Sequence, residues 1–138
     1  MISEKPNFLW PTNIDHAATK EFWEGLQRRQ FLVKKCHRCG EMFFPPRSHC
    51  PHCLGNDLEW VELNGKGTLH SWTEVNIAGP EFDTPFLLGL VDLPQGIGRI
   101  VAKIVEAEAH QLKIGMPVKI IYADVHKDLS LYRITIDQ

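Results

Sequence analysis

Residues 36–55 read CHRCGEMFFPPRSHCPHCLG, and this stretch decides how the chain folds. Its four cysteines form two C-x2-C pairs, and ten residues separate the pairs. Each pair closes a tight knuckle whose two sulfurs take two corners of a tetrahedron, so a hairpin that joins the knuckles brings four thiolates to one metal ion. The sequence therefore predicts a metal centre with the ligands Cys36, Cys39, Cys50 and Cys53.

The metal that best suits this spacing is a structural zinc ion. A closed shell of four sulfurs leaves no open coordination position for chemistry, and clustered cysteines in a reducing compartment favour metal binding over disulfides. Iron in a rubredoxin-like site and redox-active C-x2-C pairs are the alternatives at this point. A segment of about 25 residues buries too little apolar surface to fold alone, so metal binding is expected to supply its folding free energy.

An amphipathic helix is expected before the cysteines. Thr12 and Asp15 are typical of a helix start, because a hydroxyl and an acid three residues later satisfy the free amides there. Phe22 and Leu26 then continue one apolar stripe, which is expected to end near residue 30. Residues 1–30 are therefore assigned to an N-terminal helical segment, which covers a core or docks on a partner.

The rest of the chain is rich in strands. Alternating or continuous apolar runs at 31–35, 41–44 and 58–63 flank the cysteines and define a zinc ribbon over residues 31–63. Five further runs, mostly bounded by Gly, Pro or Asp, lie at 67–76, 86–93, 99–105, 118–125 and 129–136. Five strands with short connections hide their edges well in a small closed barrel, so residues 64–138 are predicted to form a five-stranded OB-fold barrel. The predicted fold is mainly β, with an N-terminal α-helix.

Composition and charge limit the classes of function. The chain has 138 residues, of which 43% are hydrophobic and 23% charged, so it is an ordinary globular protein rather than a large two-domain enzyme. Its formal net charge is −2, but residues 28–53 hold six Lys and Arg against one Glu, a net +5. No apolar run approaches the roughly 18 residues of a membrane span, and the polar N-terminus lacks an export signal. A cytoplasmic protein without membrane contact is therefore expected.

The order of these motifs resembles a known family, the acyl-CoA-associated zinc-ribbon and OB-fold proteins of the domain-of-unknown-function-35 type. The resemblance covers nearly the whole chain. Each motif alone is weak, but the ordered set is specific, and it consists of FWEGL at 22–26, CHRCG at 36–40, FPPR at 44–47 before CPHC at 50–53, GKGTLHSWT at 65–73, PFLLGLVDL at 85–93 and IGMPV at 114–118.

The resemblance implies a rubredoxin-like zinc ribbon followed by an OB-fold barrel, and a role as the small partner subunit of thiolase-superfamily enzymes. Relatives of this kind accompany archaeal acetoacetyl-CoA thiolase and the benzoylsuccinyl-CoA thiolase of toluene breakdown. The catalytic residues then belong to the large subunit, so no catalytic residue is assigned in this chain. One structural zinc ion is the implied cofactor, and an acyl-CoA thioester is the implied ligand of the complex.

Three residues are candidates for contact with CoA. Arg38 and Arg47 belong to the basic segment, and an arginine fork binds a phosphate in two places at once. Strict alternation places Trp72 on the same face of its strand as Thr68 and His70, and OB faces often offer aromatic rings for stacking on a base. Arginines that are solvated or paired with a partner's acids, and a tryptophan in the core or a subunit contact, are the alternatives.

Two other functions compete with the subunit role. A nucleic-acid-binding module is the main alternative, because zinc ribbons and OB barrels both serve that purpose. The charge of the barrel half argues against it, since residues 54–138 carry 7 basic and 12 acidic residues. Catalysis by this chain alone is not favoured, because the sequence has no Gly-rich phosphate loop, nucleophile elbow or HExxH motif.

Overall fold

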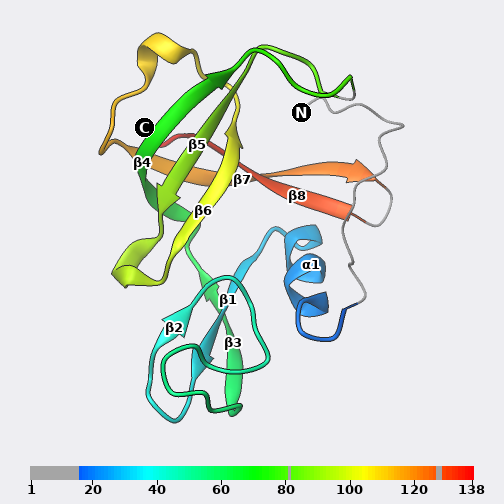
Figure 1. Cartoon of the computed structure of the whole chain (residues 1–138), viewed down its shortest axis with the longest axis vertical. Helices are drawn as coiled ribbons and strands as arrows, with labels where there is room; N and C mark the ends of the chain where they lie inside the picture. The colour runs from blue at the N-terminus through cyan, green and yellow to red at the C-terminus, as the bar shows by residue number, and fades with distance from the viewer. Residues whose placement is uncertain (1–15, 81, 127–128) are drawn as a thin grey trace.

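The computed structural model describes residues 16–80, 82–126 and 129–138 (Figure 1). Their elements are α1 (Lys20–Gln27), β1 (Phe31–Cys36), β2 (Met42–Phe43), β3 (Leu58–Leu63), β4 (Lys66–Val75), β5 (Phe86–Asp92), the 3-10 helix η1 (Pro94–Gly96), β6 (Arg99–Ile104), the 3-10 helix η2 (Ala109–Gln111), β7 (Pro117–His126) and β8 (Leu129–Ile136). No helix among these residues is long and apolar enough to cross a membrane.

Strand β1 is the centre of the ribbon sheet. It pairs antiparallel with β2 on one side and with β3 on the other, which gives the order β2-β1-β3. Phe31 and Val33 at the start of β1 are buried in the main core, whereas Cys36 at its end is buried in a separate small cluster with Cys50. One short strand therefore runs from the main core to the cysteines.

Strands β4 to β8 form a closed barrel in the order β4-β5-β6-β8-β7. Its pairs are antiparallel except for β6 and β8, which run parallel where Ile104 meets Ile134. This order is that of an OB-fold barrel, so the predicted fold class is confirmed. Every predicted strand is present, and its ends lie within one residue of the predicted ones.

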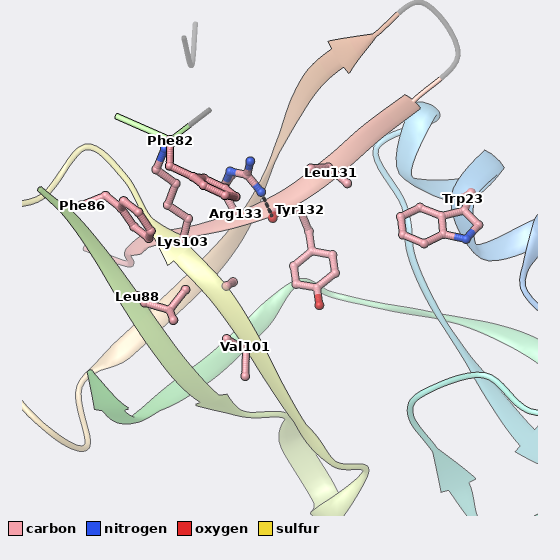
Figure 2. Close-up of a pocket in the computed structure, with 10 residues that line it drawn as sticks. Trp23, Phe82, Phe86, Leu88, Val101, Lys103, Leu131, Tyr132 and Arg133 are labelled. Atoms are coloured by element: carbon pink, nitrogen blue, oxygen red, sulfur yellow. Dashed lines mark hydrogen bonds between the residues drawn. The ribbon is translucent and has the colours of Figure 1, made fainter. Parts of the chain in front are cut away.

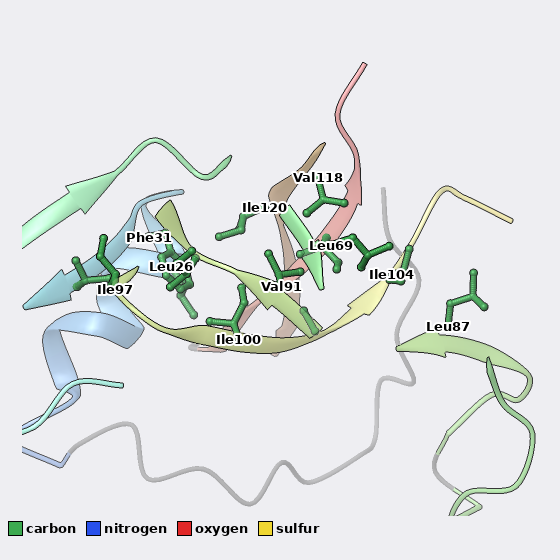
Figure 3. Close-up of a cluster of buried hydrophobic side chains, with 14 of the residues drawn as sticks. Leu26, Phe31, Leu69, Leu87, Val91, Ile97, Ile100, Ile104, Val118 and Ile120 are labelled. Atoms are coloured by element: carbon green, nitrogen blue, oxygen red, sulfur yellow. The ribbon is translucent and has the colours of Figure 1, made fainter. Parts of the chain in front are cut away.

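The barrel interior is filled by aliphatic side chains from alternate positions of the strands. Leu69 and Val91 are at most 1% exposed, and Figure 3 shows them next to Ile100 inside the barrel. Gly89 leaves room for this packing. A Cβ there would lie 2.8 Å from Cδ1 of Ile134 and 3.0 Å from Cδ1 of Ile104, so a larger residue would displace these two core side chains.

Helix α1 is shorter than the sequence predicts. Residues 16–19 form a turn instead of helix, and the predicted cap at 12–15 lies outside the described residues. The helix ends at Gln27, because the N–H of Gln30 folds back and donates to the carbonyl oxygen of Gly25 at 2.8 Å. The part of the predicted apolar stripe that lies in the helix is buried as expected.

Arg29 follows the helix in the left-handed backbone region, with φ of 63°. This conformation usually belongs to glycine, but here the side chain makes contacts that glycine lacks. Its guanidinium donates to both carboxylate oxygens of Asp124 on β7, at 3.0 and 2.8 Å. The hydroxyl of the buried Ser130 donates to the same carboxylate at 2.6 Å. These bonds tie the end of the helix to the barrel and hold the pKa of Asp124 at about 2.

Replacement of Asp124 by asparagine is expected to lower the free energy of unfolding near neutral pH by up to about 1 kcal/mol, the upper range for an exposed ion pair. Folding depresses the pKa of this carboxylate from 3.8 to about 2. Its contribution is therefore complete above about pH 5 and is lost progressively as the pH falls through 2. Urea unfolding of both chains at a series of pH values measures this effect, and their stabilities should converge in acid.

The control for this comparison is Glu74→Gln, because Glu74 is exposed and makes no ion pair within the described residues. The Glu74→Gln chain should follow the unsubstituted chain at every pH. A constant difference between the Asp124→Asn chain and the unsubstituted chain, from neutral pH down into acid, would contradict the role given to the Asp124 charge.

An aromatic cluster joins the helix, the ribbon and the barrel. Phe31 of β1 lies at its centre, and its ring centroid is 5.6 Å from that of Phe22 in α1, 5.3 Å from Phe44 and 5.4 Å from Tyr132 in β8. Phe31 is fully buried and Phe22 is 4% exposed. The three parts of the molecule therefore share one continuous core and do not meet across a solvated joint.

Candidate metal centre

The four predicted ligands come together at the end of the ribbon that is remote from the barrel (Figure 1). Their Sγ atoms all lie within 4.8 Å of one another, and the pairs Cys36–Cys53 and Cys39–Cys50 are each 3.6 Å apart. Four sulfurs at about 2.3 Å from one ion would be about 3.8 Å apart. The two sulfur atoms of a disulfide would be only about 2.05 Å apart. The geometry and the four-sulfur donor set therefore fit one tetrahedral zinc ion, in a structural role.

Backbone N–H groups in the knuckles favour the deprotonated sulfurs that a metal needs. The N–H of His52 donates to Sγ of Cys50 at 3.4 Å. The backbone N–H of Cys39, and to a lesser degree that of Arg38, lowers the pKa of Cys36 to about 7 against the opposing effect of burial. Cys36 and Cys50 are both fully buried, so these amides take the place of water as donors.

The two knuckles have the same turn but use different residues for it. The N–H of Gly40 donates to the carbonyl oxygen of Cys36 at 2.9 Å. In the second knuckle, the N–H of Leu54 donates to the carbonyl oxygen of Cys50 at 2.8 Å. Gly40 has φ of 79°, which glycine adopts without strain. Leu54 has φ of 63° at the equivalent position, and its side chain is 75% exposed. Because the Leu54 side chain is exposed, its burial within this chain does not offset the backbone strain of the left-handed conformation.

Replacing Leu54 with glycine is expected to raise the free energy of unfolding by about 0.5–1 kcal/mol. The left-handed region costs a residue with a Cβ about 1–2 kcal/mol, and the greater freedom of glycine in the unfolded chain cancels part of this gain. The thermal midpoint of the zinc-loaded protein is the measurement. Leu54→Ala is the matched control, because it removes the apolar side chain and keeps the Cβ. If the Leu54→Gly chain is no more stable than the Leu54→Ala chain, the claim of backbone strain at Leu54 is contradicted.

His37 connects the first knuckle to β3. Its Nδ1 lies 3.1 Å from Oδ1 of Asp57, and its Nε2 lies 3.1 Å from Oε2 of Glu59. Both ring nitrogens are thus engaged by carboxylates, and Glu59, followed by Asp57, raises the pKa of the imidazole. Sequence reasoning missed this bridge, because these acids follow some 20 residues later and only the register of β1 against β3 brings them together.

Two of the residues assigned to CoA, Arg38 and Arg47, lie on the ribbon as exposed side chains. Nζ of Lys34 donates to the carbonyl oxygen of Arg47 at 2.9 Å and lies 4.8 Å from the centroid of the Trp60 ring. The backbone at Arg47 is therefore anchored while its side chain faces solvent. Neither guanidinium has a carboxylate partner among the residues that the structure describes.

Trp72, the third residue assigned to CoA, lies in the barrel and packs against the main core. The pairing of β4 with β5 shifts between Leu69 and Ser71, so that Leu69 pairs with Val91 and Trp72 with Gly89. Trp72 therefore shares the inward face of Leu69. The strict alternation predicted for this strand is wrong, because a β-bulge adds one residue and reverses the faces beyond it. The argument for stacking on a base fails at this position.

Comparison with known proteins identifies the family. The model of the rubredoxin-like zinc ribbon domain of ChsH2 matches residues 23–59, and that of the C-terminal OB-fold domain of ChsH2 matches residues 60–122. A DUF35 domain-containing scaffold protein of Methanothermobacter thermautotrophicus is 32% identical over 114 residues, which are 80% of this chain and 85% of that protein. The chain belongs to the DUF35 family. The resemblance stated from the motifs is confirmed.

Other relatives of this DUF35 chain have names that refer to CoA enzymes. The probable enoyl-CoA hydratase alpha subunit of Thermomonospora curvata is 32% identical over 133 residues, which are 93% of this chain and 40% of that protein. The benzoylsuccinyl-CoA thiolase subunit BbsA of Thauera aromatica is 37% identical over 70 residues, 51% of this chain and 48% of that protein. This chain therefore matches less than half the length of each.

A solved structure extends the similarity to the whole fold. It is a chain of the Ltp2-ChsH2(DUF35) aldolase, which superimposes on this DUF35 chain with a TM-score of 0.81 at 26% sequence identity. The match covers 91% of this chain and 98% of that chain. Helix, ribbon and barrel are therefore arranged alike in the two proteins.

Proposed function

We propose that this chain is the non-catalytic small subunit of a thiolase-type acyl-CoA complex, in which it assembles with a large catalytic subunit and helps to bind the acyl-CoA. The observation that carries the proposal is the match to the Ltp2-ChsH2(DUF35) aldolase, because it extends over 98% of that chain. The similarity to a benzoylsuccinyl-CoA thiolase subunit supports a thiolase-type partner. Four clustered cysteines without a disulfide support assembly in the reducing cytoplasm.

The chemistry of the chain supports its non-catalytic role. Forming or cleaving a carbon–carbon bond next to a thioester needs a nucleophile and a group that stabilises an enolate. The four cysteines of this chain are all metal ligands in the proposed site, so no thiolate is left as a nucleophile. A zinc ion with four sulfur ligands has no open position for a substrate. In this proposal, the large subunit supplies the reacting groups.

The ribbon is the part of the chain that we assign to CoA. Arg38 and Arg47 are exposed beside the metal centre, in the segment that carries a net charge of +5. A guanidinium binds a phosphate through two parallel hydrogen bonds, and CoA has a 3′-phosphate and a pyrophosphate. The proposal therefore places the nucleotide end of CoA at the ribbon and its thioester in the large subunit.

The experiment that tests this function is affinity purification of the tagged full chain from an extract of its native cells, with mass spectrometry of proteins recovered in stoichiometric amount. We expect a thiolase-superfamily protein that stays bound in moderate salt. The tagged Cys36→Ser chain, which is expected to lack a folded ribbon, is the control for specific capture. In the recovered complex, Arg47→Ala should weaken CoA binding about tenfold, the usual effect of losing one charge-assisted contact.

A different result would identify a different function. Recovery of nucleic acid or ribosomal proteins that dissociate in moderate salt would contradict the subunit role and support the nucleic-acid-binding alternative. A purified chain that cleaves a 3-oxoacyl-CoA unaided would contradict the absence of catalysis. Unchanged CoA affinity in the Arg47→Ala complex would remove Arg47 from the CoA site and leave the assembly role intact.

A further inference from the structure

A pocket lies on the outside of the barrel, between helix α1 and the outer faces of β5, β6 and β8. Figure 2 shows Trp23 on the α1 side and Phe86 with Lys103 on the opposite side. The volume is about 380 Å³, which is in the range of small-molecule sites. Sequence analysis assigned no function to this region. The pocket is separate from the metal centre, since no residue of the ribbon lines it.

The walls of the pocket are apolar at positions that face away from the barrel core. Leu87 and Gly89 of β5 point inward and are buried, so their neighbours Phe86 and Leu88 point outward. On β6 the outward position next to them is Val101, which is 56% exposed. The outer face of a small barrel is normally polar. These three side chains therefore form an unusual apolar surface, and the Tyr132 ring extends it toward the helix.

Two cationic side chains lie in this apolar setting. Lys103 of β6 holds its ammonium 5.2 Å from the centroid of the Phe86 ring, and it has no carboxylate partner among the described residues. Arg133 of β8 is 7% exposed, and it donates to the carbonyl oxygen of Tyr132 at 3.2 Å. None of the described residues that line the pocket is acidic. The described lining is therefore apolar, and the Lys103 ammonium is available as a donor to an anion.

We propose that this pocket binds a small anionic amphiphile, with an aromatic or short aliphatic body against Phe86, Leu88 and Val101 and its anionic group at the Lys103 ammonium. The apolar walls recognise the body by burial, and a charge-assisted hydrogen bond from Lys103 recognises the anion. This chemistry is that of a free aromatic or aliphatic carboxylate. The proposal does not depend on the subunit role, because one chain makes the whole pocket.

Isothermal titration of the full zinc-loaded chain with 4-phenylbutyrate tests the proposal, and 4-phenylbutan-1-ol is the matched neutral probe. We expect the carboxylate to bind about tenfold more tightly than the alcohol, because one hydrogen bond to a charged group contributes about that difference in affinity. Lys103→Met keeps the length of the side chain and removes its charge. It should abolish the preference for the carboxylate and leave the affinity for the alcohol unchanged.

A second variant tests the apolar wall. Val101→Trp adds a large side chain at the pocket and should weaken both probes at least tenfold. The matched controls are Lys119→Met and Ile114→Trp, two exposed positions outside the pocket, and neither should change either affinity. Circular dichroism confirms that each variant is folded, which is expected because all four positions have side chains outside the core.

Each outcome of these titrations either supports the proposal or overturns it. Binding of 4-phenylbutyrate that Lys103→Met weakens assigns the pocket to free carboxylates. Binding of 4-phenylbutyryl-CoA alone would contradict the proposal, because its acyl arm has no carboxylate for Lys103. The proposal is overturned when neither probe binds, when acid and alcohol bind equally, or when Lys103→Met leaves every affinity unchanged. None of these results depends on the purification of a catalytic partner.

Discussion

The Cys36→Ser chain is expected to purify without zinc and to unfold at a midpoint more than about 10 °C lower than the unsubstituted chain. Cys36 is fully buried at the junction of β1 and the first knuckle, and its sulfur lies 3.6 Å from that of Cys53. A serine hydroxyl is a poor ligand for zinc, so one corner of the tetrahedron is lost. Zinc binding supplies about 10–16 kcal/mol to the folding of small zinc-finger peptides, and a modest part of that loss produces this shift.

The measurement is the metal content of each purified chain, together with its thermal unfolding followed by circular dichroism. His52→Ala is the matched control, because His52 is exposed and contributes to the site through its backbone N–H. It should retain one zinc ion per chain. Retention of zinc by the Cys36→Ser chain, or an unchanged midpoint, would contradict a structural four-cysteine site. A red protein with rubredoxin-like absorption would support the iron alternative.

The Phe31→Ala chain is expected to lose about 3–5 kcal/mol of unfolding free energy, the range for removing a buried phenylalanine side chain. Phe31 is fully buried, and its ring contacts Phe22 of the helix, Phe44 of the loop after β2 and Tyr132 of the barrel. The cavity would therefore open where all three parts meet. We expect the helix and the ribbon to separate from the barrel well before the barrel itself unfolds.

Urea unfolding followed by tryptophan fluorescence and far-ultraviolet circular dichroism measures both effects. The two signals should coincide for the unsubstituted chain and differ for the Phe31→Ala chain. Two of the three described tryptophans, Trp23 and Trp60, lie in the helix and the ribbon and only Trp72 lies in the barrel, whereas most strands lie in the barrel. Ile77→Ala is the control. Ile77 is 92% exposed, so its replacement should change stability by no more than about 0.5 kcal/mol. A loss below about 1 kcal/mol for Phe31→Ala would contradict a shared core.

Most of the fold was predictable because its signals are local. The C-x2-C pairs need only a hairpin to meet, and each strand shows its own apolar pattern. β8 shows the limit of such patterns. Its residues 129–131 and 133–135 are all buried, so the side that faces the barrel core cannot be read from alternation. Only the pairing with β6 and β7 shows that Ile134 lies inside the barrel.

The errors and omissions have non-local causes. The face of Trp72 depends on a bulge, which a pattern of polar and apolar residues does not reveal. The ion pair of Arg29 and Asp124 joins residues 95 positions apart, and nothing near either residue indicates the other. The outer pocket was missed because Leu88 and Val101 have the same chemistry as core residues. Their exposure becomes visible only when the barrel fixes which side of each strand is outside.

The order of the elements along the chain has a consequence for biosynthesis. All four metal ligands precede β4, the first strand of the barrel, so the ribbon can capture its zinc ion while the barrel residues are still inside the ribosome. The barrel closes only when β8 reaches both β6 and β7, and helix α1 also packs against β8. The first helix of the described chain is thus among the last elements to dock. Zinc supply therefore acts at the start of folding, before closure of the barrel.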